Sequence, residues 1–138
     1  MIDGSFITNL PDTWALNQRF IMLALNGWNR PYRKIQLGGL TCDSQDYYNA
    51  EKHIYQTFLP QLQAPRNQQA TDQPIYVGFF HTGAYQESLS GYGGIKHCLI
   101  PAPKHVILDR AADGTLSDYV FAPKQEASSM LKILGYTA

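Results

Sequence analysis

The alternation of apolar and polar residues predicts a mainly β chain. Phe20 to Leu25 (FIMLAL) is a short apolar run that Asn26-Gly27 ends, and it is too short for three helical turns, so it favours a buried strand. Lys34 to Leu40 (KIQLGGL) alternates polar and apolar residues, which predicts a second strand. Ile75 to Phe80 (IYVGFF) predicts a third strand.

The second half of the chain predicts further strands and a turn. His97 to Leu108 combines β-branched residues with Pro101 and Pro103, which places these prolines at a bulge, an edge or a bend between two strands. Ala112 to Gly114 (ADG) is typical of a hairpin turn, and Tyr119 to Ala122 predicts the strand that follows it. We therefore expect a mainly β fold of five or more strands.

Helix and loop signals are few. The tail from Lys124 to Leu134 predicts a helix with one apolar face, made of Ala127, Met130, Leu131 and Leu134. Ala64 to Pro74 is polar, has a proline near each end and shows no periodicity, so we expect an exposed loop. Ile2 and Phe6-Ile7 flank Gly4-Ser5, and we expect the chain to open inside a strand, as if cut from something longer.

The composition indicates the number of domains and excludes some classes of partner. With 138 residues, of which 44% are hydrophobic, the chain has the size and core content of one domain, so we expect residues 1–138 to form a single domain. Eleven basic and eleven acidic residues give no net charge and form no run, which argues against nucleic acid and membrane surfaces as partners. No apolar segment is long enough to span a membrane, and the start does not resemble a signal peptide, so we expect a cytoplasmic protein.

One candidate site is Thr41 to Ser44 (TCDS), at the end of a predicted strand. Cys42 can exchange a proton near neutral pH if its surroundings tune its pKa, and an ionised Asp43 can pair with an ammonium or guanidinium group. The alternative is structural: Cys42 would be a small buried residue, and Asp43 would open a turn. With only two cysteines in different contexts, we expect both Cys42 and Cys98 to be thiols.

A second candidate is His81 to Tyr85 (HTGAY). Gly83 and Ala84 are small enough for a ligand to approach the backbone, and the Tyr85 hydroxyl can donate to a phosphate or carboxylate. The alternative is a strand that ends in a glycine turn, with the Tyr85 ring packed for structure. Both interpretations remain open from the residues alone.

The other chemical patterns are weaker. The glycines of Gly91 to Cys98 (GYGGIKHC) match neither a dinucleotide nor a Walker motif, so a turn is the simpler interpretation. The four histidines and two cysteines lack zinc-ligand spacing, so no metal site is expected. A cysteine hydrolase would need a distant histidine, and no family signature surrounds Cys42 or Cys98.

Three segments resemble one known family. LTCDS and GFFHTGAYQ, in this order and about forty residues apart, are similar to two signatures in the C-terminal β domain of the alanine racemase and ornithine decarboxylase fold, a sandwich or barrel-like domain. LPDTWALNQRF is similar to a segment of the arginine decarboxylase branch. The chain is thus identified as resembling the C-terminal domain of a pyridoxal-phosphate-dependent basic amino acid decarboxylase, with arginine preferred over ornithine as the substrate.

The resemblance implies roles for five residues. Cys42 would protonate the carbanion left by loss of carbon dioxide, Asp43 would hold the distal cation of the substrate, and Gly83, Ala84 and Tyr85 would contact the cofactor phosphate. In this family the Schiff-base lysine lies in an N-terminal α/β barrel, and the site forms between the barrel of one subunit and the C-terminal domain of its partner. This chain has no such barrel, so we expect it to be inactive alone and to need a barrel domain or chain within a homodimeric enzyme of polyamine biosynthesis.

The main alternative is a non-catalytic relative that keeps the fold and regulates a true decarboxylase. The presence of both Cys42 and Asp43 favours the catalytic interpretation, because a purely regulatory role does not require this pair.

Overall fold

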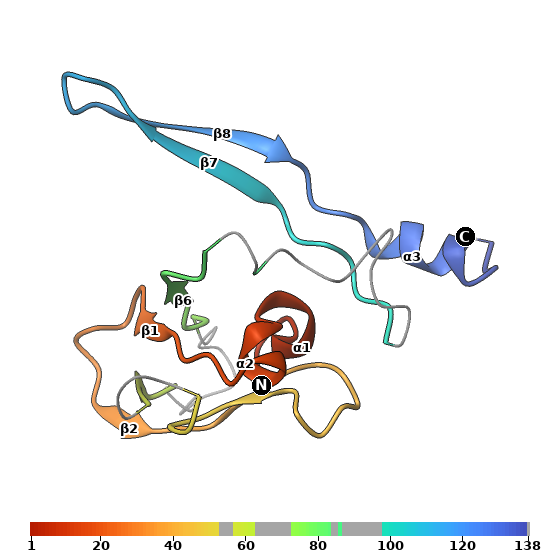
Figure 1. Cartoon of the computed structure of the whole chain (residues 1–138), viewed down its shortest axis with the longest axis horizontal. Helices are drawn as coiled ribbons and strands as arrows, with labels where there is room; N and C mark the ends of the chain where they lie inside the picture. Colours follow the sequence, from red (N-terminus) through yellow and green to blue (C-terminus); the bar gives the residue numbers. More distant parts are fainter. Residues whose placement is uncertain (53–56, 63–72, 84–85, 87–97, 138) are drawn as a thin grey trace. The chain divides into compact units, whose positions relative to one another are not determined.

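The structure is a computed structural model that describes residues 1–52, 57–62, 73–83, 86 and 98–137. The chain divides into two compact units, Met1–Gln86 and Glu87–Ala138, and each is considered by itself. Short antiparallel strand pairs dominate both units, and helices are few and short (Figure 1). The predicted mainly β class is therefore confirmed, although none of the described sheets closes into a barrel. A single domain over residues 1–138 stays a prediction.

The described residues of the first unit form three two-stranded antiparallel sheets, β1 with β6, β2 with β5, and β3 with β4. Two one-turn helices precede them (Figure 1). The elements of this unit are α1 (Phe6–Asn9), α2 (Asp12–Ala15), β1 (Ile21–Ala24), β2 (Tyr32–Lys34), β3 (Leu37–Gly38), β4 (Tyr47–Tyr48), β5 (Phe58–Pro60) and β6 (Val77–Phe80).

Two of the predicted strands of this unit are confirmed and one is divided. β1 lies within Phe20 to Leu25, and β6 lies within Ile75 to Phe80. The strand predicted from Lys34 to Leu40 is wrong as a single element, because the chain changes partner there: β2 ends at Lys34 against β5, and β3 begins at Leu37 against β4. The loop predicted from Ala64 to Pro74 lies outside the described residues except for its last two positions.

The start of the chain differs from the expected strand. Ile2 N donates to Gly38 O at 2.9 Å in a strand-like contact, but Phe6 begins helix α1. The Ser5 hydroxyl accepts a hydrogen bond from Thr8 N at 3.3 Å, and this cap favours a helical turn over an extended segment.

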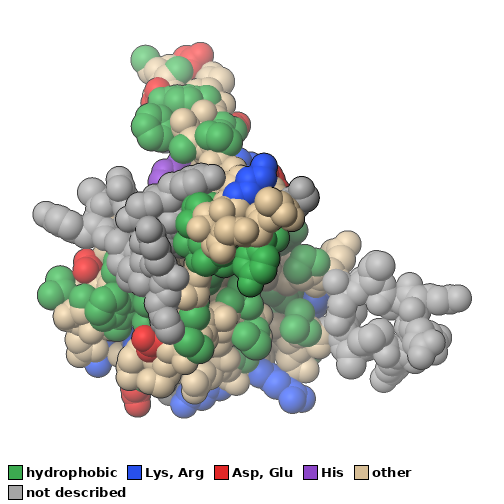
Figure 2. All heavy atoms as spheres, turned by 90° about the vertical axis from the view of Figure 1, so that its right-hand side faces the viewer, with side chains coloured by type: hydrophobic (Ala, Val, Ile, Leu, Met, Phe, Trp, Pro, Cys, Tyr) green, Lys and Arg blue, Asp and Glu red, His purple; other side chains and the backbone are tan. Residues whose placement is uncertain are grey.

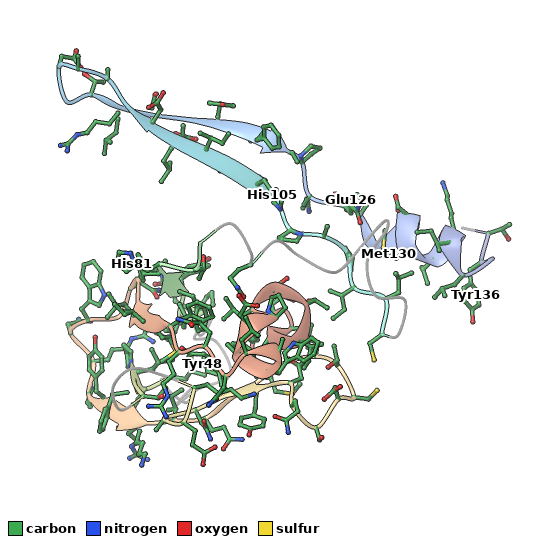
Figure 3. The ribbon with its side chains drawn as sticks, viewed as in Figure 1. Tyr48, His81, His105, Glu126, Met130 and Tyr136 are labelled. Atoms are coloured by element: carbon green, nitrogen blue, oxygen red, sulfur yellow. The ribbon has the colours of Figure 1, made fainter. Side chains whose placement is uncertain are left out.

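The core of the first unit is centred on three aromatic rings. Phe6 stacks on Tyr48 at 5.5 Å between ring centroids, and Phe79 meets both rings edge-on, at 5.8 Å and 5.0 Å. Tyr48 is fully buried and lies inside this unit (Figure 3). Its hydroxyl donates to Phe20 O at 2.7 Å and accepts from Phe20 N at 3.3 Å, so its polar end is satisfied. The rings thereby join α1, β4, β6 and the residue before β1.

Alkaline pH is expected to destabilise the first unit through Tyr48. Burial raises the pKa of Tyr48 to about 12, against the opposing hydrogen bond with Phe20. Because the folded pKa lies above the unfolded value of 10.0, the contribution is complete below pH 10 and is lost as the pH rises to about 12. A shift of this size corresponds to roughly 3 kcal/mol of unfolding free energy. Urea unfolding at pH 9 and pH 11.5 measures the loss, which Tyr48→Phe should remove; the same loss in Tyr48→Phe would contradict it.

The second unit contains a hairpin and a helix. β7 (His105–Arg110) pairs antiparallel with β8 (Leu116–Ala122) in a long ribbon (Figure 1), with an irregularity between His105 and Val106. The predicted turn is confirmed, since Gly114 N donates to Ala111 O at 2.9 Å. Hydrophobic side chains are exposed along this ribbon, which forms the top of the view in Figure 2; they include Leu108, Leu116 and Phe121.

The prolines and the last helix differ in detail from the prediction. Pro101 and Pro103 lie in a segment without regular structure that precedes β7, so the described residues do not place them between two strands. Helix α3 (Ala127–Ile133) is shorter than predicted. Of its predicted apolar face, Met130 is buried whereas Leu131 and Leu134 are exposed.

Candidate functional site

The loop between β3 and β4 carries Cys42 and Asp43 on its surface. Both residues are exposed, and Cys42 and Cys98 are thiols. The structural alternative of a buried Cys42 is therefore wrong. The structural interpretation of Asp43 is confirmed: its Oδ1 accepts a hydrogen bond from Gln45 N at 2.7 Å, which is an Asx turn. An ionised carboxylate can accept further hydrogen bonds at its two oxygens, so this turn does not prevent Asp43 from binding a cation.

Asp46 anchors the base of this loop. Its side chain is only 6% exposed. Oδ2 accepts from Thr41 N at 2.9 Å and from Thr41 Oγ1 at 2.6 Å, while Oδ1 accepts from Phe6 N at 2.7 Å and from Ile7 N at 3.4 Å. One carboxylate thus connects the start of the loop to the start of α1.

The charge state of Asp46 follows from these contacts. Burial alone would raise its pKa, but the hydrogen bonds from Thr41, together with those from Phe6 and Ser5, outweigh burial and lower the pKa below 3.8. Asp46 is therefore a buried anion at neutral pH, stabilised by hydrogen bonds to its charged form.

Lys52 supports the loop from a second direction. It is also 6% exposed, its Nζ donates to Gln45 O at 3.1 Å, and the ammonium lies 4.0 Å from the Tyr47 ring centroid. Burial lowers the pKa of Lys52, whereas the negative charges of Asp46 and Asp43 oppose this shift. The carbonyl and the ring face replace part of the water that the ammonium loses.

Sequence reasoning missed Asp46 and Lys52 as parts of the site. Asp43, Asp46 and Glu51 all follow closely after Thr41, and nothing in the local pattern distinguishes the buried Asp46 from the other two acids. The available signal was Gly39, because a glycine next to a strand end can mark close approach of another group.

Gly39→Ala is expected to destabilise the first unit. A Cβ on Gly39 would collide with the Asp46 carboxylate, which cannot move without leaving its hydrogen bonds. Overpacking of this kind costs about 1–3 kcal/mol of unfolding free energy. Gly38→Ala is the matched control, since among the described residues the atom nearest to a Cβ there would be Met1 Cγ, at an ordinary contact distance of 3.9 Å. Equal urea midpoints for the two variants would contradict the predicted crowding.

The second candidate segment follows β6. His81 has a φ of +58° and lies at the end of this strand (Figure 3), and Gly83 has a φ of +69°. Among the described residues, no atom lies within 4 Å of where a Cβ on Gly83 would stand. Ala84 and Tyr85 lie outside the described residues, as do residues 91–97 and His53.

The structure brings the three resembling segments into one unit. Asp12 lies in LPDTWALNQRF, and Gln86 ends GFFHTGAYQ; Gln86 Nε2 donates to Asp12 Oδ2 at 2.6 Å, and Asp12 N donates to Gln86 Oε1 at 3.2 Å. Asp46, two residues after TCDS, binds the start of α1. Helices α1 and α2 are therefore the common attachment for the TCDS loop and for the residue that ends GFFHTGAYQ.

The described part of the chain has neither a membrane-spanning helix nor a cluster of metal-binding side chains. None of its helices has the length and apolar character needed to cross a membrane. Among the same residues, no group of three or more His, Cys, Asp or Glu side chains could hold a metal ion.

Comparison with known proteins gives one consistent group of relatives. No protein-family profile matches the chain. Biosynthetic arginine decarboxylase of Marinobacter nauticus is 35% identical over 92 residues, which are 64% of this chain and 14% of that protein. The same enzyme of Neisseria meningitidis is 32% identical over 124 residues, 86% of this chain and 18% of that protein. That of Deinococcus radiodurans is 31% identical over 137 residues, 96% of this chain and 19% of that protein.

These matches extend over most of the chain but over little of each relative. The chain spans 14–20% of the length of the curated relatives that it matches, at 28–35% identity. The matched stretch is of domain size, and the relatives share one name. The comparisons therefore support assignment of this chain as a domain of the biosynthetic arginine decarboxylase family.

Proposed function

We propose that this chain is the C-terminal domain of a pyridoxal-phosphate-dependent basic amino acid decarboxylase, with arginine as the preferred substrate and ornithine next. It would act in the cytoplasm, in polyamine biosynthesis, and complete a site shared with a barrel domain in a homodimer. The observation that carries the proposal is the exposed pair of Cys42 and Asp43 on a loop fixed by buried Asp46. The similarity to biosynthetic arginine decarboxylases supports it.

Cys42 and Asp43 would do different work in this site. Cys42 Sγ would hold the proton that is delivered to the substrate α-carbon after carbon dioxide leaves. The Asp43 carboxylate would bind the guanidinium group, and its hydrogen bond with Gln45 N holds it in one orientation before the substrate arrives. The proton donor and the cation-binding group would thus act at different ends of an extended substrate.

The described part of the phosphate segment is compatible with pyridoxal phosphate. Gly83 has a positive φ and no side chain, which suits close approach of a phosphate to the backbone, and no atom of the described residues occupies the place of its missing Cβ. When bound, the cofactor supplies the electron sink that makes loss of carbon dioxide possible. Gly83 and Ala84 would admit the phosphate, and the Tyr85 hydroxyl would donate a hydrogen bond to it.

Complementation tests the proposal. The chain should restore release of carbon dioxide from arginine when it is combined with the barrel part of a biosynthetic arginine decarboxylase, because the active site is divided between the two parts. Each part alone should be inactive. The rate with ornithine, measured in the same assembly, tests the substrate preference.

The control is the same chain with Cys42→Ala and Asp43→Asn together. This double variant should bind the barrel part without restoring activity. Binding of the unaltered chain without activity would contradict the catalytic proposal and favour the regulatory relative.

A further inference from the structure

The backbone of the Cys42–Asp43 loop is held on both sides. Asp46 N donates to Asp43 O at 3.0 Å, and Gln45 N donates to the Asp43 carboxylate at 2.7 Å. Lys52 Nζ holds Gln45 O at 3.1 Å. Each of these contacts restrains the main chain next to Asp43, although the Cys42 and Asp43 side chains remain exposed.

The Asp46 carboxylate is a further contact that holds this loop. It accepts two hydrogen bonds from Thr41, at the start of the loop, and two from the first two residues of α1. Asp46 N meanwhile reaches Asp43 O, so one residue fixes the loop at its beginning, at its middle and to a neighbouring element. A buried anion that accepts this many hydrogen bonds is held in one position, because any movement would leave a desolvated charge with fewer hydrogen bonds.

Gly39 provides the room that this carboxylate needs. Gly39 N donates to Asp46 O at 2.8 Å, and the missing side chain of Gly39 leaves the volume that the carboxylate occupies. Both sides of the β3–β4 connection are thus shaped around Asp46. Thr41, the residue immediately before Cys42, donates two hydrogen bonds to Asp46. A residue that only stabilised the unit as a whole would not need two contacts so close to Cys42.

We propose that Asp46 is a positioning residue: it holds the loop from Thr41 to Gln45 so that Cys42 and Asp43 are presented to the substrate in a fixed geometry. The inference rests on the proposed function, which assigns the proton donor and the cation-binding group to these two residues. Asp46 itself does not touch the substrate. Lys52 assists by holding Gln45 O.

The first experiment measures the loop in this chain alone. In Asp46→Asn the side chain loses its charge and one carboxylate oxygen becomes an amide donor, so the hydrogen bonds from Thr41 and Phe6 are weakened and cannot all be kept. Because hydrogen bonds to charged groups are strong, we expect amide hydrogen exchange of Thr41, Gln45 and the substituted residue itself to rise roughly tenfold to a hundredfold. The matched control is Asp113→Asn, since Asp113 also accepts a backbone hydrogen bond in a turn, from Thr115 N at 2.9 Å. It should leave exchange in the loop unchanged.

The second experiment measures substrate kinetics in the assembled two-part enzyme. Asp46→Asn should raise the KM for arginine about tenfold or more, because Asp43 no longer meets the guanidinium in one orientation, while the concentration of pyridoxal phosphate needed for half-maximal activity stays the same. A uniform loss of folded protein would lower the amount of active enzyme without changing KM. The KM therefore separates positioning from general stability.

The outcomes are distinct. Unchanged exchange in the loop would overturn the inference whatever the kinetics, and faster exchange with an unchanged KM would also overturn it. Faster exchange together with a raised KM would support it. Inactivity of the unaltered assembly would refute the proposed function and the positioning role with it, and faster exchange would then show only that Asp46 holds the loop.

Discussion

Replacing Cys42 with alanine is expected to slow decarboxylation of arginine by about 10²–10⁴-fold in the assembled enzyme, because a positioned proton donor contributes a factor of this size. Substrate affinity should be retained, since Asp43 and its hydrogen bond with Gln45 stay in place. Part of the remaining turnover should end in transamination of the cofactor, because the proton then arrives at the wrong position. Steady-state kinetics, with product analysis, measures both effects.

Cys98→Ala is the matched control for this experiment. Cys98 is also a thiol, but it lies in the second unit and has no role in the proposed chemistry, so its loss should leave the rate within about twofold of the unaltered enzyme. An unchanged rate and product in Cys42→Ala would remove Cys42 from its proposed role. Equal losses in both variants would indicate a general effect on the fold.

Tyr48→Ala is expected to lower the unfolding free energy by about 3–5 kcal/mol, the range for deletion of a large buried aromatic ring. The ring contacts both Phe6 and Phe79, and its hydroxyl satisfies the backbone of Phe20. Because domains of this size have about 5–15 kcal/mol in total, this loss should remove a large share of the stability of the first unit and lower its unfolding midpoint clearly. Urea or thermal unfolding followed by near-ultraviolet circular dichroism measures the change.

Tyr119→Ala provides the comparison. Tyr119 lies on β8 and is 55% exposed, so its removal should change the unfolding free energy by about 0.5 kcal/mol or less. Similar losses for Tyr48→Ala and Tyr119→Ala would show that the aromatic cluster is not the core of the first unit.

Much of the strand pattern was available from local sequence. β1, β6 and the hairpin turn before β8 lie where apolar runs and turn residues predict them, because each of these signals depends on neighbouring residues. The division of the predicted strand after Lys34 depends on a change of partner from β5 to β4. Such a change involves residues distant in the chain, which a local pattern does not contain.

The candidate site, too, was predicted only in part from the local sequence. The TCDS segment identified Cys42 and Asp43, and the alternation of the strand before it placed them near a strand end, where side chains are accessible. Their exposure, however, depends on the fold, and the local pattern by itself favoured a buried, structural Cys42. The structure shows the cysteine exposed.

By itself, the sequence determined the mainly β class, the hairpin turn and the resemblance of three segments to a decarboxylase family, since all of these are encoded in residues close together in the chain. Only the tertiary structure decided which carboxylate is buried. Asp46 and Asp43 are chemically identical and three residues apart, but Asp46 lies next to donors from Thr41 and Phe6, whereas Asp43 faces solvent. A charge is buried only where distant groups supply its hydrogen bonds, and those groups come together only when the chain folds.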